Sequence, residues 1–171
     1  MSLLDSPAPP LTLRPLSLTD GPALQAVYQA SADFFRDRAG APPDPGQAEA
    51  DLAATAAEEG RFLLGIALHE AMIGLIDLRL AYPEPFDVSI GLILLAESQR
   101  RQRLGSWALR MLETWLRRDT PTEAVVVAVP AQDHAAQVFF TANGYGFTGQ
   151  ATRVLAGSTR LRLLEMRKSL I

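Results

Sequence analysis

The sequence predicts one α/β domain in which a strand-rich middle is followed by a single β-α-β crossover. The chain has 171 residues, of which 48% are hydrophobic and 20% charged, enough for one domain with a sizeable core. Three apolar runs separated by short polar turns fill residues 61–96. A helical pattern then separates the third run from a further, unbroken apolar segment, which is typical of a crossover between parallel strands.

The N-terminal part is proline-rich at two places and amphipathic between them. Alternation of apolar and polar residues predicts a strand, and apolar stripes at helical spacing predict helices. Ser, Thr or Asp before a stripe and Gly after it mark helix ends. The expected elements are a flexible arm over residues 1–10, a strand over 11–16, helices over 19–28 and 45–59, and a loop over 40–46.

The middle and the C-terminal half alternate between apolar strands and amphipathic helices. The segment 123–129 is almost entirely β-branched or small, as in a central strand covered on both faces, and we expect it to pair parallel to the strand before the crossover helix. We expect strands over residues 61–68, 71–80, 86–96, 123–129, 145–155 and 159–167, and helices over 105–119 and 133–142. The domain proper would then span residues 11–171.

The bulk composition narrows the function. With no Cys and only two His, disulfides, a thiol nucleophile and cysteine-ligated zinc are excluded, and we expect no metal site. The formal charge of −3 gives no overall attraction to nucleic acid or to an anionic membrane surface, so we expect neither partner. The first residues lack the features of a signal peptide, and no apolar run approaches the roughly 20 residues of a membrane span. The expected location is the cytoplasm.

Three arginines fall within residues 100–103, between an apolar strand and a helix that begins near Gly105. A helix N-terminus carries unpaired N–H groups and the positive end of the helix dipole, so each cation there costs on the order of 0.3–1 kcal/mol. A bound anion removes this conflict, with the N–H groups of residues 101–106 directed at phosphate oxygens. Alternatively, the turn is a solvated basic surface that pairs with Glu97 or Glu113.

The strand before this turn continues as an aliphatic run, residues 93–96. If it separates from its parallel neighbour after Gly91, its backbone groups become available to an extended ligand. Such an N–H group could also stabilise the oxyanion of an acyl-transfer reaction. The alternative is an ordinary core strand.

Residues 100–105, RRQRLG, resemble the cofactor-binding turn of GNAT superfamily N-acetyltransferases, Gln/Arg-x-x-Gly-x-Gly/Ala, with Arg103 in place of the first Gly. Ile90-Gly91 and the aliphatic run match the strand that precedes this turn in the family. A second motif, Asn-x-x-Ala-x-x-x-Tyr-x-x-x-Gly-Phe, has counterparts at Asp133, Ala136, Phe140, Gly144 and Tyr145. The resemblance implies one GNAT-like domain of the α/β (α+β) class. Its mixed, mostly antiparallel sheet would have six to seven strands, a splayed parallel pair and about four flanking helices.

The resemblance also implies a binding site for acetyl-CoA as cosubstrate. The backbone amides at Leu94 and Leu95 would hold the pantetheine arm and the thioester carbonyl, which makes Leu95 part of the catalytic set. The implied cofactor-binding residues are Leu94, Leu95, Arg100, Arg101, Gln102, Arg103, Leu104, Gly105, Ser106, Asp133 and Phe140.

Two departures from the family bear on acid–base chemistry. Phe140 stands where the family often has a Tyr that protonates the CoA thiolate, and Ser89 stands where a Glu often assists amine deprotonation. Asp87 shares the strand face of Ser89 and is the expected base, directly or through a water. Tyr82, Tyr145 and Ser89 are candidate acids, although CoA thiolate leaves well enough that positioning alone could suffice.

The sequence therefore predicts an N-acetyltransferase in which a primary amine of a small molecule or peptide attacks the thioester in a ternary complex. Phe34, Phe35 and Tyr82 are expected in the acceptor pocket, whereas Phe34 and Phe35 could instead form a hydrophobic flap over the core. The alternative function is a non-catalytic acyl-CoA-binding or sensing domain. A nucleic-acid-binding module is disfavoured by the charge, and a homodimer is possible.

Overall fold

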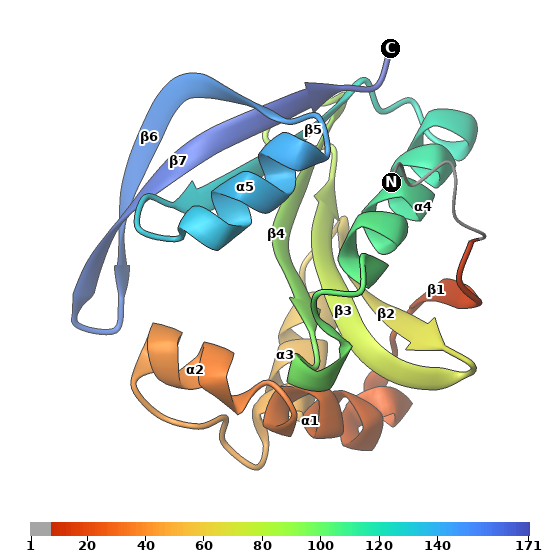
Figure 1. Ribbon diagram of the computed structural model, residues 1–171, viewed down its shortest axis with the longest axis vertical. Helices are drawn as coiled ribbons and strands as arrows, with labels where there is room; N and C mark the ends of the chain where they lie inside the picture. The colour runs from red at the N-terminus through yellow and green to blue at the C-terminus, as the bar shows by residue number, and fades with distance from the viewer. Residues whose placement is uncertain (1–7) are drawn as a thin grey trace.

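The computed structural model describes residues 8–171 as a single curved sheet with helices on both faces (Figure 1). The strands are β1 (Leu11–Pro15), β2 (Arg61–Leu68), β3 (Ala71–Leu80), β4 (Asp87–Leu95), β5 (Ala124–Pro130), β6 (Gly146–Ala156) and β7 (Thr159–Ser169). The helices are α1 (Gly21–Gln29), α2 (Ala32–Ala39), α3 (Gln47–Ala56), α4 (Leu104–Asp119) and α5 (His134–Ala142), with 3-10 turns η2 (Leu18–Asp20) and η3 (Glu97–Gln99).

The fold class expected from the sequence is confirmed. The sheet has the order β1-β2-β3-β4-β5-β7-β6, and every neighbouring pair is antiparallel except β4 and β5. Five α-helices occur in the described residues where about four were expected, because α2 forms a separate helix before Gly40, which has φ +75°. Most of the predicted flexible arm, residues 1–10, lies outside the described residues, and the domain boundary stays a prediction.

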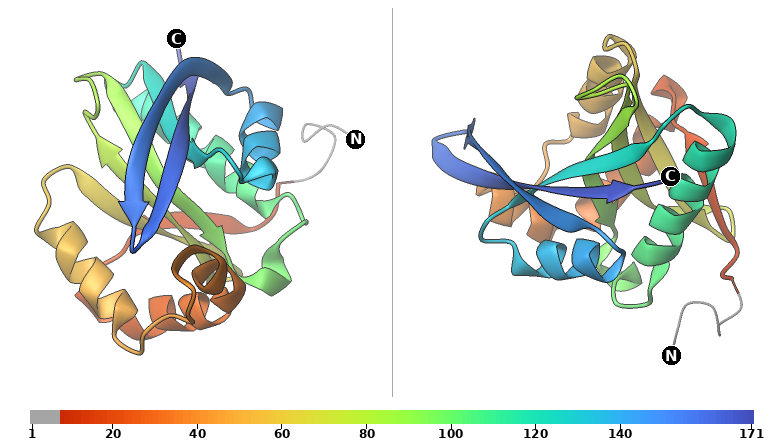
Figure 2. Two further views of the ribbon diagram at one scale, coloured as in Figure 1. Left: turned by 90° about the vertical axis from the view of Figure 1, so that its left-hand side faces the viewer. Right: turned by 90° about the horizontal axis from the view of Figure 1, so that it is seen from above.

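Helices cover the two faces of the sheet in different places. On one face α1 and α3 pack through Leu24 and Leu52 against Leu75 of β3 and Leu94 of β4. On the other face α4 and α5 pack against β4 and β5, as the right-hand view of Figure 2 shows. The C-terminal half of the sheet therefore carries helices only on the face of α4 and α5. On the face of α1 and α3, no described helix packs over β5 and β7.

Two glycines fix the path of β4. Gly91 is the extra residue of a β-bulge, because Ile90 pairs with Leu78 and Leu92 pairs with the adjacent Asp77. At Gly74 of β3, a Cβ atom would collide with the carbonyl oxygen of Leu94, so only glycine lets the two strands approach this closely. These two glycines therefore determine which backbone groups and side chains of β4 point to each side as the strand runs toward the arginine-rich turn.

The parallel pairing of β4 and β5 is short. Residues 87–90 pair with residues 124–127, after which β4 remains paired only with β3 and β5 only with β7. Figure 1 shows the two strands close together at their beginnings and apart at their ends. The separation predicted after Gly91 is present, and it begins at the bulge.

Candidate functional site

The turn before α4 has a backbone suited to binding an anion. Arg101 and Arg103 adopt left-handed conformations with φ +61° and φ +62°. Arg103 is the N-cap of α4, and no side chain caps the helix there. The first-turn N–H groups of Leu104, Gly105 and Ser106 have no partners within the helix. Left-handed residues next to an uncapped helix N-terminus form the concave N–H array typical of phosphate sites.

Two polar side chains of the turn have protein partners. Gln102 donates to the Ser98 carbonyl at 3.0 Å, which closes the turn. The Arg100 guanidinium donates to Asp33 of α2 at 2.5 and 3.2 Å and to the Leu95 carbonyl at 3.0 Å. Pairing with Arg100 lowers the pKa of Asp33. The Arg100 side chain therefore links the turn to α2, a role that the sequence did not suggest because 67 positions separate the two residues.

The backbone of β4 presents N–H groups on the side that β5 leaves. Ala96 donates to the Ile73 carbonyl of β3, and the direction of backbone groups alternates along an antiparallel strand. The Leu94 N–H therefore points toward β3, whereas those of Ile93 and Leu95 point away from it. Of the two predicted amides, only the Leu95 N–H faces the side from which β5 has separated. The Ile93 N–H points to the same side. The sequence could not assign this phase, because it depends on the bulge.

Side chains of α5 approach the same place. A Cβ at Gly105 would lie 3.3 Å from the Phe139 ring and 3.6 Å from the Leu95 side chain. Ser106 accepts a hydrogen bond from Asn143 at 3.0 Å, which ties α4 to α5. The lack of a side chain at Gly105 thus keeps space where α4, α5 and β4 meet. Phe139 was missed by sequence reasoning, which assigned the neighbouring Phe140.

Asp133 and Phe140, both predicted to contact the cofactor, have structural roles. Asp133 caps α5 by accepting the Ala136 N–H at 3.0 Å. Phe140 is buried, with its ring centroid 5.2 Å from that of Tyr145. Each residue does what its type favours locally, since Asp is a good N-cap and Phe a good core residue.

Tyr145 is not placed to act as the general acid, which corrects one of the sequence-based candidates. Its hydroxyl donates to Glu113 at 3.0 Å inside the core, and burial raises the pKa of Tyr145. Lys168 completes this group by donating to Glu113 at 2.7 Å and to the Asn143 carbonyl at 2.9 Å. Both carboxylate oxygens of Glu113 are thus bonded inside the core, so the pairing of Glu113 with the arginine turn that the sequence allowed is not present.

Asp87 does not have the surroundings of a general base. Its side chain is 3% exposed, and both carboxylate oxygens accept hydrogen bonds from Arg167 of β7, at 2.8 and 2.9 Å. This pairing raises the pKa of Arg167. Ser89, two residues further on, lies half-buried on the same face and lines a cavity. The expected proximity of Asp87 and Ser89 is present, but the carboxylate is occupied.

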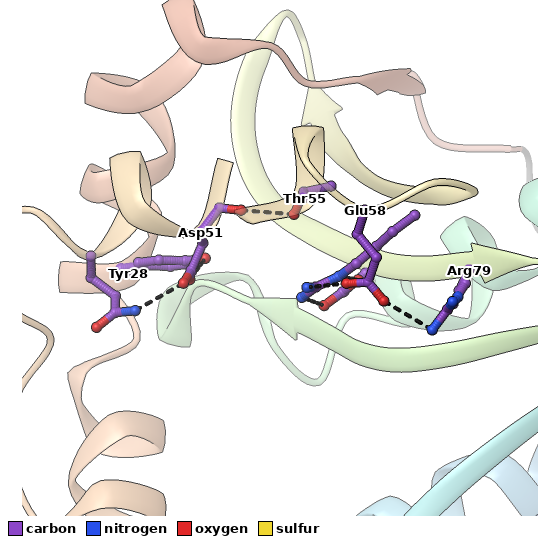
Figure 3. Close-up of polar contacts among 8 residues, drawn as sticks. Tyr28, Asp51, Thr55, Glu58 and Arg79 are labelled. Atoms are coloured by element: carbon purple, nitrogen blue, oxygen red, sulfur yellow. Dashed lines mark hydrogen bonds and ion pairs between the residues drawn. The ribbon is translucent and has the colours of Figure 1, made fainter. Parts of the chain in front are cut away.

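The cavity beside Ser89 has a volume of about 230 Å³ and opens on the face of the sheet that carries α3. Glu58 pairs there with Arg61 at 3.1 Å and with Arg79 at 2.9 Å, and Figure 3 shows the pair that Glu58 forms with Arg79. Arg61 also pairs with Asp77 at 2.7 Å, which raises the pKa of Arg61. The lining residues are Glu58, Arg61, Asp77, Leu78, Arg79, Tyr82, Ser89 and Gly91.

Buried polar contacts support this cavity from behind. Tyr28 of α1 donates to Asp51 of α3 at 2.6 Å, and Thr55 donates to the Asp51 carbonyl at 2.7 Å (Figure 3). Burial raises the pKa of Tyr28, so its hydroxyl stays protonated and fixed. The first bond holds α1 against α3, and the second lies within α3, shortly before the turn that carries Glu58.

The predicted acceptor residues lie in two places. Tyr82 lines the cavity, with the Arg79 guanidinium 4.5 Å from its ring centroid. Phe34 and Phe35 lie on α2. The Phe35 ring is tilted by 55° against the Tyr28 ring with the centroids 5.0 Å apart, and both phenylalanines pack against the core cluster of α1 and α3. The hydrophobic flap considered for Phe34 and Phe35 describes this packing.

Comparison with known proteins gives a consistent family. A family model described as "Acetyltransferase (GNAT) domain" matches residues 10–146. No curated protein matches the sequence.

Similar solved structures include an acetyltransferase from Thermus thermophilus, 23% identical over 95% of this chain and 98% of that one, with a TM-score of 0.78. Another is the Salmonella typhimurium acetyltransferase that modifies the N-terminal serine of ribosomal protein L7/L12, with 15% identity, 93% and 94% coverage and a TM-score of 0.80. A third, PaiA N-acetyltransferase from Thermoplasma acidophilum in complex with coenzyme A, has 15% identity, 93% and 98% coverage and a TM-score of 0.67. At these identities the likeness establishes the fold.

Neither a metal-binding cluster nor a membrane-spanning helix occurs among the described residues. No group of three or more His, Cys, Asp or Glu side chains among residues 8–171 is arranged to hold a metal ion. No helix in the same range is long and apolar enough to cross a membrane.

Proposed function

This chain belongs to the GNAT family of acetyltransferases, and on that premise we propose that it transfers an acetyl group from acetyl-CoA to a primary amine. The single observation that carries the proposal is the junction of β4 and α4. There, an uncapped helix N-terminus follows a strand whose parallel partner has turned away. We propose a cytoplasmic enzyme, and a homodimer stays a prediction.

The residues at this junction fit a CoA thioester. The N–H groups of Leu104, Gly105 and Ser106 would bind the pyrophosphate together with Arg101 and Arg103 side chains. The Ile93 and Leu95 N–H groups would receive the pantetheine arm as a strand-like ligand. Arg100 and Ser31 bind the Leu95 carbonyl at 3.0 and 3.3 Å, which supports a fixed orientation of this peptide.

Backbone donors would supply most of the catalysis. As the amine attacks the thioester carbon, a C–N bond forms, the C–S bond breaks and the thiolate leaves. A β4 N–H group directed at the carbonyl oxygen stabilises the negative charge that develops there, which is worth roughly 10²–10³ in rate for one well-placed donor. Holding both substrates in line adds the advantage of proximity.

Proton transfer would rely on water rather than on a dedicated carboxylate. Asp87 and Tyr145 are buried and paired, so neither faces a substrate. Ser89 lines the cavity beside Gly91 and is placed to hold a water that takes the amine proton. The acceptor would be a small-molecule amine or a peptide N-terminus, the latter being the substrate of the Salmonella neighbour.

A non-catalytic acyl-CoA-binding or sensing domain is the second candidate, favoured by the pairing of Asp87. Two measurements separate the candidates. Acetyl-CoA should raise the melting temperature in both cases, whereas thiol release with a panel of primary amines is expected only of the enzyme. Binding without thiol release from any amine would favour the sensing domain, and absence of binding would exclude both.

The cofactor assignment itself is tested by Gly105→Glu. A carboxylate at this position would fill the space beside Phe139 and Leu95 and repel phosphate, so CoA binding should be lost. Gly146→Glu is the matched control, because a Cβ there meets no atom within 4 Å. Calorimetric titration with CoA, combined with urea unfolding to verify folding, should show loss in the first variant only. Normal affinity of folded Gly105→Glu would refute the phosphate site.

A further inference from the structure

The cavity beside Ser89 belongs to a row of charged side chains across the sheet. Strand register places Arg61 opposite Arg79, Arg79 opposite Ser89, Ser89 opposite Val126, and Val126 opposite Arg167. Residues directly opposite each other share one face, so three arginines and Ser89 lie on the same side of the sheet. On this side α1 and α3 cover part of the sheet, and no described helix covers β5 and β7.

Each arginine in this row is paired with a carboxylate. Arg167 is 44% exposed, whereas Asp87 behind it is 3% exposed. Arg79 is 41% exposed and its partner Glu58 is 37% exposed. Arg61 at 29% is more exposed than Asp77 at 20% but less exposed than Glu58 at 37%, its second partner. These three carboxylates are thus paired with arginines, and the guanidinium groups of Arg79 and Arg167 remain partly exposed to solvent. The partly exposed guanidinium groups offer N–H donors to an anion.

Arg61 and Arg79 both line the cavity, and Arg79 is the one that lies directly opposite Ser89. Its guanidinium lies over the Tyr82 ring at 4.5 Å, and its Nη1 atom forms an ion pair with Glu58 at 2.9 Å. A guanidinium has five N–H donors, so most of its capacity for a planar anion remains. Arg79 lies opposite Ser89 on the neighbouring strand, about 5 Å away at the backbone, and Gly91 adjoins the same cavity.

We propose that the acceptor is a primary amine that carries a carboxylate within a few bonds of the amine, and that Arg79, supported by Tyr82 and Glu58, binds this carboxylate. The short spacing follows if the thioester carbonyl is bound close to the bulge of β4, where the strands separate, because the same small cavity adjoins both Arg79 and Gly91. Free amino acids and peptides with an acidic residue next to the N-terminus share this chemistry. The inference rests on the proposed acetyl transfer and names its substrate class.

The test compares matched acids and amides in the full-length protein. The substrates are alanine with alaninamide, and serylaspartate amide with serylasparagine amide, measured by thiol release at saturating acetyl-CoA. A carboxamide makes the neighbouring amine of alaninamide less basic, so more of it is unprotonated at neutral pH, and a preference for alanine cannot arise from amine ionisation. We expect kcat/KM to be at least tenfold higher for the acid in one pair, which also identifies the source of the carboxylate.

Variants connect the preference to Arg79. Arg79→Gln should abolish the preference for the acid and change the KM for acetyl-CoA by less than twofold, while Arg79→Lys should keep part of it. Arg153→Gln, the same change on exposed β6, is the control and should behave like the wild type. Equal use of acid and amide in both pairs by the wild type, or an unchanged preference in Arg79→Gln, would overturn the inference.

A binding measurement separates this inference from the proposed function. Calorimetric titration of the CoA complex with the four acceptors needs no turnover. If thiol is never released but one acid binds at least tenfold more tightly than its amide, and Arg79→Gln removes this difference, the carboxylate site stands and acetyl transfer fails. If amines are acetylated without any distinction of charge, acetyl transfer stands and the carboxylate site fails. If the protein shows no turnover and no selective binding of an acid, both proposals are refuted.

Discussion

Arg103 adopts a left-handed backbone conformation of the kind that glycine usually provides. The GNAT turn usually has Gly at this position, and here Arg103 adopts the same left-handed region, with φ +62°. A non-glycine residue in this region costs roughly 1–2 kcal/mol, which is tolerated where the surrounding structure fixes it. The turn before α4 thus has a left-handed backbone at a residue that carries a long cationic side chain.

This reasoning predicts that Arg103→Gly and Arg103→Ile will differ, although both remove the same charge. Gly relieves the backbone strain, whereas a β-branched residue increases it. We expect Arg103→Ile to melt several degrees lower than Arg103→Gly and to bind CoA at least fivefold more weakly, measured by thermal denaturation and calorimetry. Identical behaviour of the two variants would show that the left-handed turn is not needed for binding.

The Asp87–Arg167 pair is asymmetric, so its two partners should not be equally important. Arg167→Met leaves a 3% exposed carboxylate without a partner, which should cost about 2–4 kcal/mol in unfolding free energy. Asp87→Asn keeps the buried shape, and the released Arg167 is solvated, so we expect a loss of about 1 kcal/mol. Urea denaturation at pH 7 measures the difference.

The same Asp87→Asn variant tests the revised view of the proton transfer. Its kcat with a good acceptor should stay within about fivefold of the wild type, because the carboxylate faces Arg167 and not the substrate. A loss of a hundredfold or more in folded protein would restore Asp87 as the base.

At the scale of secondary-structure elements, α2 is joined by few contacts to the turn before α4, which is proposed to bind CoA. The helix has no fully buried residue, and its links to the β4–α4 junction are the Asp33–Arg100 ion pair and two neighbouring hydrogen bonds, Ser31 to the Leu95 carbonyl and Glu97 to the Ala30 carbonyl. An element held in this way is expected to open locally more easily than the sheet.

We predict that Asp33→Asn loosens α2 without unfolding the domain. The ion pair is partly exposed and contributes about 0.5–1 kcal/mol, so amide hydrogen exchange in residues 34–39 should accelerate about two- to fivefold. Asp37→Asn, the same change elsewhere on α2, is the control and should leave exchange unaltered. Equal exchange in both variants, measured by mass spectrometry, would show that other contacts hold the helix.

Strands and helices were largely predictable, whereas side-chain partners were not. The bounds of β2, β3 and β5 follow from their apolar runs and turn residues, and the position of the turn between β4 and α4 follows from its arginines and Gly105. The partners of Arg100 and Asp87 lie 67 and 80 positions away. Those contacts depend on strand register and on helix packing, which no local pattern encodes.

At the scale of the whole molecule, the two proposed substrate sites lie on opposite faces of the sheet, near the place where β4 and β5 separate. The arginine turn, α4 and α5 form the side proposed for CoA, and the cavity lined by Arg79, Tyr82 and Ser89 lies on the other face. An amine that approaches from the cavity would meet the thioester where β4 and β5 part. This arrangement allows both substrates to be bound at once, as direct attack requires.

The distribution of titratable groups predicts the pH dependence of the reaction. Around the proposed site, Asp87, Asp77 and Glu58 are paired with arginines and Tyr145 is buried, so the proton that must leave before attack is that of the acceptor amine. The apparent pKa in kcat/KM should then follow the amine when acceptors of different basicity are compared, rising by about one unit for each unit in amine pKa. Steady-state thiol release between pH 6 and 10 with three such acceptors provides the measurement. An apparent pKa that stays constant across the acceptors would instead identify a titrating protein group as the base.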